Sequence, residues 1–183
     1  MQTIVYLLLA PGFEEVEALA PVDLLRRAGV AVQTVSIEES KTVVGARNIP
    51  VVADLSLAQL DFDAMKMLIL PGGYPGYENL GKCPGVKALL EKAFAAGKTI
   101  AAICGAPVVP GRMGLLRDYK ATCYPGMEGE LHCKEFIPVP VVKDGNLITS
   151  RGAGTALDFA LALVEEMVSA EKAEELRKGI VYL

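Results

Sequence analysis

Continuous runs of apolar residues recur along the chain and predict buried β-strands. Residues 4–9, 67–70 and 100–103 contain no charged side chain and are bounded by turn-forming residues. A strand with one face in water alternates apolar and polar positions, whereas a continuous apolar run is typical of a strand covered on both faces, as in a parallel sheet. We therefore expect three central strands of a parallel sheet.

Between these runs, apolar positions recur at helical spacing. Residues 14–28 and 86–94 each carry an apolar stripe, and each stripe is followed by a glycine that can end a helix. Pro21 falls inside the first segment, where it should kink the helix. Residues 157–168 predict a third helix. Residues 169–179 predict a short fourth helix, which starts at a serine cap and ends with basic residues.

Two segments break this alternation and predict β-hairpins. The first joins two valines at 43 and 44 to residues 49–52. The second joins residues 139–142 to 147–149 through the turn at residues 143–146, where Asp-Gly is a strong hairpin signal. Pro138 and Pro140 suggest that the second hairpin lies at a sheet edge, because proline donates no hydrogen bond to a neighbouring strand.

Together these elements predict one domain over residues 1–183, in the α/β class. We expect a flavodoxin-like, doubly wound, mainly parallel sheet with helices on both faces. A chain of 183 residues suits a single domain with a full core. Ligands of such folds gather at the carboxyl ends of the strands, so candidate chemistry is sought there.

Charge and composition exclude several classes of function. The net charge is −4 and the basic residues are dispersed, so we expect no stable nucleic-acid partner. No apolar stretch is long enough to span a membrane, and the amino terminus lacks the features of a signal peptide, which favours a cytoplasmic protein. Four cysteines without a CxxC pair form no disulfide framework. The single histidine, His132, adjoins Cys133, so we expect no metal site.

The most informative residue is Cys104, which directly follows the apolar run at 100–103. A buried strand that ends in a nucleophile, followed by small residues and a helix start, is the layout of a nucleophile elbow. A helix N-terminus there would stabilise a thiolate, and the N–H of Gly105 could face a developing oxyanion. The alternative is that Cys104 is a small core residue, and the spacing alone does not decide between the two.

The other strand ends share that edge of the sheet. Gly73 follows the run at 67–70 in a glycine-rich loop, but the spacing matches no nucleotide-binding motif. Glu14 and Glu17 follow the first strand. Glu17 could project into a site beside Cys104 or could serve only to stabilise the start of its helix.

These motifs, in this order, resemble the ThiJ/PfpI superfamily, and most closely its branch of the parkinsonism-associated protein deglycase and bacterial YajL. The resemblance covers nearly the whole chain. It rests on five segments, which are Gly-Phe-Glu-Glu-Val-Glu at 12–17, Pro-Val-Asp-Leu-Leu-Arg-Arg-Ala-Gly at 21–29, Leu-Pro-Gly-Gly at 70–73, Ala-Ala-Ile-Cys at 101–104 and Thr-Ser-Arg-Gly-Ala-Gly-Thr at 149–155.

The resemblance implies a flavodoxin-like fold, a homodimer and a set of site residues. Cys104 matches the family's reactive cysteine, and Glu17 matches a protonated glutamate that hydrogen-bonds the sulfur. Gly73 and Gly105 match the backbone donors of the anion pocket. Four further residues are expected near the pocket or at the interface between subunits: Glu14, Arg27, Arg47 and Tyr124.

The implied activity is a glyoxalase or protein deglycase that needs no metal or organic cofactor. Its substrates would be methylglyoxal, glyoxal and their adducts. Cys104 would add to the aldehyde carbon to give a hemithioacetal, and Glu17 would move protons, first as acid and later as base. Low turnover is expected, because the site has no strong base.

Three differences from related proteins narrow the expected activity. Tyr124 stands where many other members carry a third catalytic histidine. The YajL-like subgroup also lacks this histidine, so its absence favours that subgroup. Gly105 replaces the histidine of peptidase-like members, which argues against a Cys-His protease. The segment at 132–134 lacks the histidine-x-glutamate of glutamine amidotransferases.

A second function uses the same cysteine. The protein could be a non-enzymatic oxidative-stress sensor or a chaperone in which Cys104 is oxidised to a sulfinate held by Glu17 and the backbone donors. A role in thiamine synthesis finds no support, because no phosphate-binding loop is present. The sequence does not separate the enzyme from the sensor.

Overall fold

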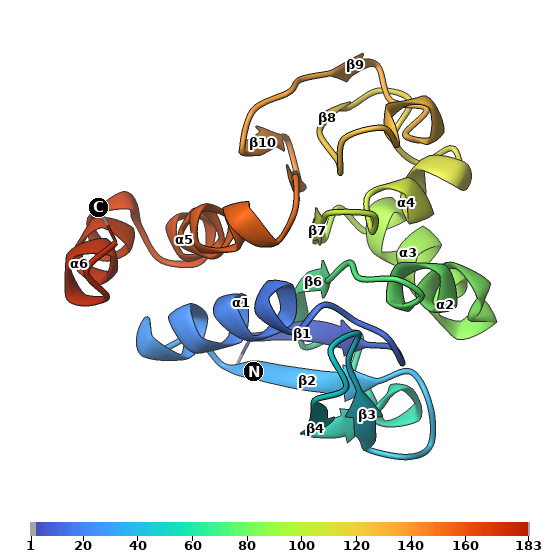
Figure 1. The fold of residues 1–183 in the computed structure, drawn as a ribbon, viewed down its shortest axis with the longest axis horizontal. Helices are drawn as coiled ribbons and strands as arrows, with labels where there is room; N and C mark the ends of the chain where they lie inside the picture. Colours follow the sequence, from blue (N-terminus) through green and yellow to red (C-terminus); the bar gives the residue numbers. More distant parts are fainter. Residues whose placement is uncertain (1–2, 183) are drawn as a thin grey trace.

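Residues 3–182 are described by the computed structural model, in which seven strands form the central sheet (Figure 1). These strands are β1 (Ile4–Leu9), β2 (Val32–Ser36), β5 (Leu55–Ser56), β6 (Met65–Leu70), β7 (Thr99–Ile103), β10 (Val141–Asp144) and β11 (Leu147–Ser150). Their order in the sheet is β10-β11-β7-β6-β1-β2-β5, and only β10 runs antiparallel to its neighbour. The three predicted central strands therefore lie side by side in a mainly parallel sheet.

Helices cover both faces of this sheet, which confirms the predicted doubly wound α/β fold (Figure 1). One face packs against α1 (Glu15–Arg27) and α5 (Ala156–Met167), and α6 (Ala170–Gly179) packs on α5 at the edge of the same apolar cluster. The other face packs against α2 (Gly76–Lys82), α3 (Pro84–Ala95) and α4 (Val108–Arg112). Each face has its own buried apolar cluster, because the side chains of a strand alternate between the two faces.

The predicted helices form with their expected ends. Helix α1 runs through Pro21 without interruption, and the chain leaves it at Gly29, whose φ of +82° suits glycine. In α6, the Ser169 side chain accepts a hydrogen bond from the Lys172 N–H, as the cap pattern predicts. Helix α4 is only five residues long and contains Pro110. A proline in the first turn is tolerated, since no helical bond uses its missing N–H.

Both predicted hairpins form. The first consists of β3 (Thr42–Val44) and β4 (Pro50–Val52), which make a small antiparallel sheet of their own. The second pairs β10 with β11 at an edge of the central sheet, as the prolines indicated. Its turn is shorter than predicted, because Asp144 already pairs with Leu147 and leaves two residues in the connection.

Short elements that the hydrophobic pattern did not predict connect these units. They are the strands β8 (Lys120–Ala121) and β9 (Glu135–Phe136) and the 3₁₀ helices η1 (Leu57–Gln59), η2 (Glu128–Glu130) and η3 (Ala153–Thr155). At the carboxyl end of the chain, Ile180 and Tyr182 pack against the core while Val181 stays exposed. Leu183 lies outside the described residues.

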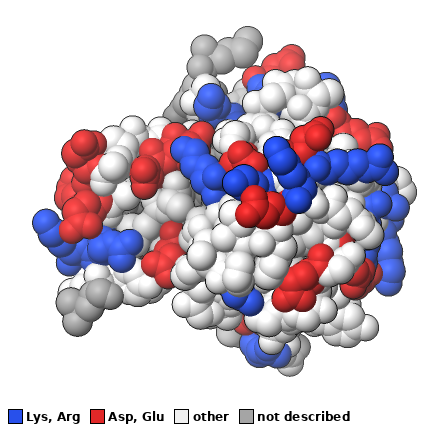
Figure 2. Space-filling model, turned by 90° about the horizontal axis from the view of Figure 1, so that it is seen from above, with Lys and Arg blue, Asp and Glu red and all other residues white. Residues whose placement is uncertain are grey.

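The surface carries both signs of charge. On the face in Figure 2, lysine and arginine side chains lie in small groups beside aspartate and glutamate. In the described part of the chain, no helix combines the length and the apolar character needed to cross a bilayer. Within residues 3–182, no group of three or more histidine, cysteine, aspartate or glutamate side chains is placed to hold a metal ion.

Candidate active site

Cys104 lies at the carboxyl end of β7, in the left-handed backbone region with a φ of +65°. This conformation is unfavourable for a residue with a Cβ and persists only where the surroundings fix it. Two hydrogen bonds do so here. The Cys104 N–H donates to the Ser150 carbonyl at 3.0 Å, and the Cys104 carbonyl accepts from the Tyr124 N–H at 2.8 Å. The turn therefore has the geometry expected of a nucleophile elbow.

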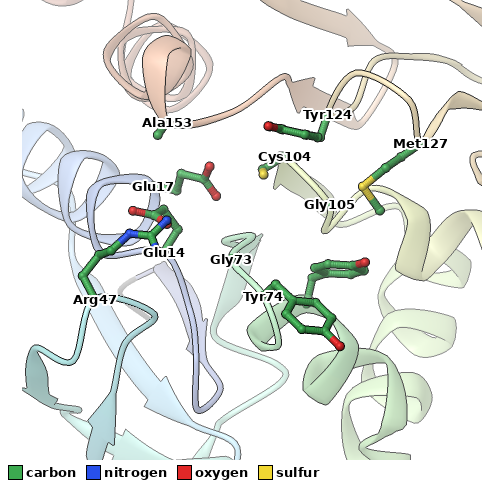
Figure 3. Close-up of a pocket in the computed structure, with 11 residues that line it drawn as sticks. Glu14, Glu17, Arg47, Gly73, Tyr74, Cys104, Gly105, Tyr124, Met127 and Ala153 are labelled. Carbon is green, nitrogen blue, oxygen red and sulfur yellow. The ribbon is translucent and has the colours of Figure 1, made fainter.

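Glu17 comes from the start of α1 and reaches the same point (Figure 3). Its side chain is buried, with 1% of the residue exposed, and its Oε2 accepts a 2.9 Å hydrogen bond from the Gly72 N–H. A Cβ at position 72 would lie 2.7 Å from that oxygen and 2.6 Å from the Cβ of Cys104. The carboxyl group and the thiol thus approach each other across a space that only glycine leaves open.

Burial governs the proton affinity of both groups. It raises the pKa of Glu17 to about 7, and the hydrogen bond with Cys104 opposes this rise. The raised pKa agrees in direction with the protonated glutamate that the resemblance implies, and burial is its main cause. Burial, followed by the negative charge of Glu17, raises the pKa of Cys104 to about 12.

The prediction that a helix N-terminus stabilises a Cys104 thiolate is therefore wrong. Helix α4 begins only at Val108 and has five residues, so its dipole is small. The backbone N–H groups of Gly73 and Gly105 lower the pKa of the thiol, but less than burial and Glu17 raise it. Burial and Glu17 thus both favour the thiol over the thiolate, and Glu17 is the neighbouring group placed to accept its proton.

Gly73 and Gly105 lie beside the sulfur, as expected from the resemblance (Figure 3). Gly73 has a φ of +89° and packs against the backbone of Glu14, so a side chain does not fit there. The backbone N–H groups of both glycines lower the pKa of the Cys104 thiol, which means that they favour negative charge on the sulfur. An oxygen that develops on a carbon bonded to this sulfur would lie next to the same donors.

Glu14 and Arg47 form the charged rim of the cavity. Arg47 comes from the connection between β3 and β4, and its guanidinium lies 3.3 Å from a carboxylate oxygen of Glu14. Neighbouring Glu15 holds this connection in place, because its Oε1 accepts hydrogen bonds from the N–H groups of Arg47 at 2.8 Å and Ile49 at 3.4 Å. Glu15 is 5% exposed and was not predicted to matter.

Arg27 does not reach the pocket, so that part of its prediction is wrong. It lies ten residues beyond Glu17 on the same helix, which at the α-helical rise is about 15 Å along the axis. Its guanidinium pairs with Asp23 at 2.8 Å on the exposed surface. A role for Arg27 at an interface between subunits stays a prediction.

The remaining wall of the cavity is aromatic and apolar. Tyr124, a predicted site residue, lines it as expected. Sequence reasoning did not single out the other lining residues, which are Tyr74, Tyr77, Met127 and Ala153. Tyr74 and Tyr77 follow the glycine-rich loop after β6, so their proximity to a strand end was the available signal. The cavity has a volume of about 460 Å³.

The other three cysteines lie apart from this site. Cys83 caps α3 as a partly exposed thiol, and Cys133 is also partly exposed in a connecting segment. Cys123 is fully buried in the apolar cluster on the opposite face of the sheet from the one that Cys104 joins. Cys123 is therefore a core residue, and all four thiols are free.

Comparison with known proteins places this site in a family context. A model of the DJ-1/PfpI family matches residues 3–166. Protein dj-1beta of Drosophila melanogaster is 40% identical over 95% of this chain and 94% of its own length. The glutathione-independent glyoxalase DJR-1.2 of Caenorhabditis elegans is 34% identical over 91% of this chain and 89% of its own. The structure of oxidized DJ-1 from Toxoplasma gondii superposes with a TM-score of 0.94, at 32% identity and 98% coverage of both chains.

Proposed function

The chain belongs to the DJ-1/PfpI family, and on that premise we propose that it is a cysteine-dependent glyoxalase that needs no cofactor. The observation that carries the proposal is the buried contact of Glu17 with Cys104, next to the backbone donors of Gly73 and Gly105. The C. elegans relative named as a glutathione-independent glyoxalase supports it. The substrates are methylglyoxal and glyoxal, and their adducts on protein groups where the enzyme acts as a deglycase.

The first step forms a carbon–sulfur bond. The Glu17 carboxylate takes the thiol proton while the Cys104 sulfur adds to the aldehyde carbon. The carbonyl oxygen becomes an oxyanion beside the N–H groups of Gly73 and Gly105, and it then receives the proton from Glu17. The product is a hemithioacetal, and Glu17 is again a carboxylate. A carboxyl group with a pKa of about 7 suits both directions of this transfer at neutral pH.

The second step moves hydrogen within the substrate. Glu17 removes the proton from the carbon bonded to sulfur, which gives an enediolate, and returns it to the neighbouring carbon, while the hydroxyl proton passes from the first oxygen to the second. The hemithioacetal thereby becomes a thioester of the 2-hydroxy acid. Water then hydrolyses the thioester, the carbon–sulfur bond breaks, and the thiol is restored. The overall reaction adds one water to the 2-oxoaldehyde, so one carbon is oxidised, its neighbour is reduced, and no external oxidant is needed.

The test is the formation of lactate from methylglyoxal by the purified protein. Cys104→Ser and Glu17→Gln should each abolish lactate formation, while Cys83→Ser, which changes a thiol outside the cavity, should keep it. Product must be measured, because any thiol depletes free methylglyoxal by reversible addition. Lactate formed at equal rates by the wild type and the Cys104→Ser variant would refute the proposal.

A second candidate is an oxidative-stress sensor or chaperone that acts without turnover. The same donors around Cys104 would hold the two oxygens of a sulfinate, and the T. gondii relative was solved in an oxidized state. Mild peroxide should then add two oxygens to Cys104 before Cys83 and Cys133, as seen by mass spectrometry of tryptic peptides. Equal oxidation of these three thiols would count against the sensor and leave the enzyme standing.

We also propose that the protein acts as a homodimer in a reducing cytoplasm, without a nucleic-acid or membrane partner. Support comes from exposed apolar side chains on α1 and the neighbouring hairpin, which are Val16, Leu19, Val44, Ile49 and Val52. Water-exposed apolar residues on adjacent elements are typical of a surface that a second subunit covers. Sedimentation equilibrium of the wild type and of a Val52→Asp variant tests this, since the charge should shift the dimer to monomer.

A further inference from the structure

The cavity over Cys104 has two chemically different walls. On one side lie the charged groups of Glu14, Glu17 and Arg47, and on the other lies Met127, with Tyr74 and Tyr124 on either side of the sulfur (Figure 3). The charged wall and the backbone donors account for the chemistry of a dicarbonyl group. The aromatic side chains take no part in the proposed reaction of the dicarbonyl group.

The size of the cavity also exceeds what the smallest dicarbonyls need. Its volume is about 460 Å³, within the roughly 300–1,000 Å³ of pockets that take drug-sized ligands. Methylglyoxal has only a handful of non-hydrogen atoms and would leave most of this space to water. A substrate that carries a larger group beside the dicarbonyl would fill it.

The tyrosines stand where such a group would lie. The ring of Tyr77 is packed onto the residue after the nucleophile, because a Cβ at Gly105 would lie 2.7 Å from its Cδ1. The ring of Tyr74 lies 6.4 Å from that of Tyr77, centroid to centroid, at an angle of 53°. The ring of Tyr124 lies near Glu17, because a Cβ at Gly152 would lie 3.4 Å from its Cδ2 and 4.0 Å from Glu17 Oε1. A substrate bonded to the Cys104 sulfur therefore shares its cavity with three aromatic side chains.

Two of these tyrosines are left largely in water. Tyr74 is 75% exposed and Tyr124 is 51% exposed. Binding of an apolar group over exposed aromatic surface is favourable, because it removes apolar surface from water. The charged side of the cavity offers no comparable contact to an apolar substituent.

From this arrangement we infer that the site prefers 2-oxoaldehydes with an aromatic or large apolar substituent, of which phenylglyoxal is the simplest probe, over methylglyoxal. The inference rests on the proposed glyoxalase function and names its substrate class. The bonds formed and broken are those of the proposed reaction: one water is added, and phenylglyoxal becomes mandelate just as methylglyoxal becomes lactate.

The test compares the two substrates in three proteins. We would measure initial rates of mandelate and lactate formation, because phenylglyoxal also modifies arginine slowly. The proteins are the wild type, the double variant Tyr74→Ala/Tyr124→Ala and the control Tyr182→Ala. The control removes a tyrosine that packs near Arg177, outside the cavity, and both residues of the double variant are exposed enough for the fold to survive.

The ratio of kcat/KM for phenylglyoxal to that for methylglyoxal is the deciding quantity. We expect it to fall roughly tenfold or more in the double variant and to stay at the wild-type value in Tyr182→Ala. An unchanged ratio in the double variant, with both products still formed, would overturn the inference and leave the glyoxalase function intact.

A binding measurement separates this inference from the proposed function. Calorimetry would compare mandelate and lactate binding to the Cys104→Ser protein, with and without the two tyrosine changes. Tighter binding of mandelate that disappears in the tyrosine variant would support the aromatic wall even if no protein formed product. Equal binding of both acids would count against it.

Discussion

The side chain of Glu17 and the backbone of Gly72 are joined by one hydrogen bond of 2.9 Å, although 55 positions separate them in the sequence. This bond fixes the carboxyl group at the end of β6, where it meets the thiol at the end of β7. The alignment requires that position 72 carry no side chain, since a Cβ there would lie 2.6 Å from the Cβ of Cys104. One glycine therefore sets the spacing between base and nucleophile.

Gly72→Ala should separate Glu17 from Cys104. The added methyl group cannot be accommodated without moving one of the two, and such overpacking costs about 1–3 kcal/mol of stability. We expect a lower midpoint of urea unfolding and a loss of hydroxy-acid formation by at least tenfold. The control is Gly129→Ala, where a Cβ would meet no neighbour within 4 Å. Full activity in a folded Gly72→Ala protein would contradict this account of the site.

Glu17→Gln should make the protein more stable at high pH. The folded state raises the pKa of Glu17 from 4.5 to about 7, so between these values the folded state binds more protons than the unfolded state. The free energy of unfolding therefore falls as the pH rises from about 4.5 to 7 and changes little above that. A neutral glutamine escapes this loss, which amounts to about 3 kcal/mol.

Urea unfolding of the wild type and Glu17→Gln at pH 8 and pH 5 measures this effect. The variant should be the more stable protein at pH 8, and most of its advantage should be gone at pH 5. An equal advantage at both values would show that the change acts through packing and not through the buried charge.

Glu15→Ala should loosen the connection that carries Arg47. The side chain of Glu15 accepts hydrogen bonds from two backbone N–H groups of that segment, which would be left without partners. Each lost hydrogen bond costs about 1 kcal/mol, so we expect a fall in the unfolding midpoint and a higher KM. Glu15→Gln keeps the accepting oxygen and should behave nearly as the wild type. If both variants are equally unstable, the hydrogen bonds are not the cause.

The sequence predicted the part of the site that lies directly at strand ends. Cys104, Gly73 and Glu17 each follow a strongly apolar strand, and adjacent parallel strands bring their carboxyl ends together. The strand pattern therefore located the residues, and the family resemblance selected Glu17 from three neighbouring glutamates. The α/β architecture followed from the same runs.

The rest depended on geometry that no local pattern encodes. The low pKa expected for Cys104 assumed a full helix after the turn, whereas the chain forms a five-residue helix that starts at Val108. Arg27 was placed near the pocket although its position along α1 carries it away from Glu17. Tyr77 lies at the start of α2 and Met127 directly before η2, and tertiary packing places both elements beside the cavity, so residue spacing did not indicate these residues.

The rate of the proposed reaction should rise with pH through about 7. The step that forms the carbon–sulfur bond requires that the Glu17 and Cys104 pair has lost one of its two protons. Glu17 loses its proton first, because its pKa is about 7 and that of Cys104 is about 12. We expect kcat/KM for methylglyoxal to increase about tenfold per pH unit below 7 and to level off above it. The rate of lactate formation between pH 5 and pH 8.5, corrected with Cys104→Ser for the uncatalysed reaction, measures the profile. Glu17→Asp, which keeps a carboxyl group but withdraws it from the sulfur, should show a lower plateau. A profile in the wild type that is flat across pH 7 would mean that Glu17 does not carry the proton.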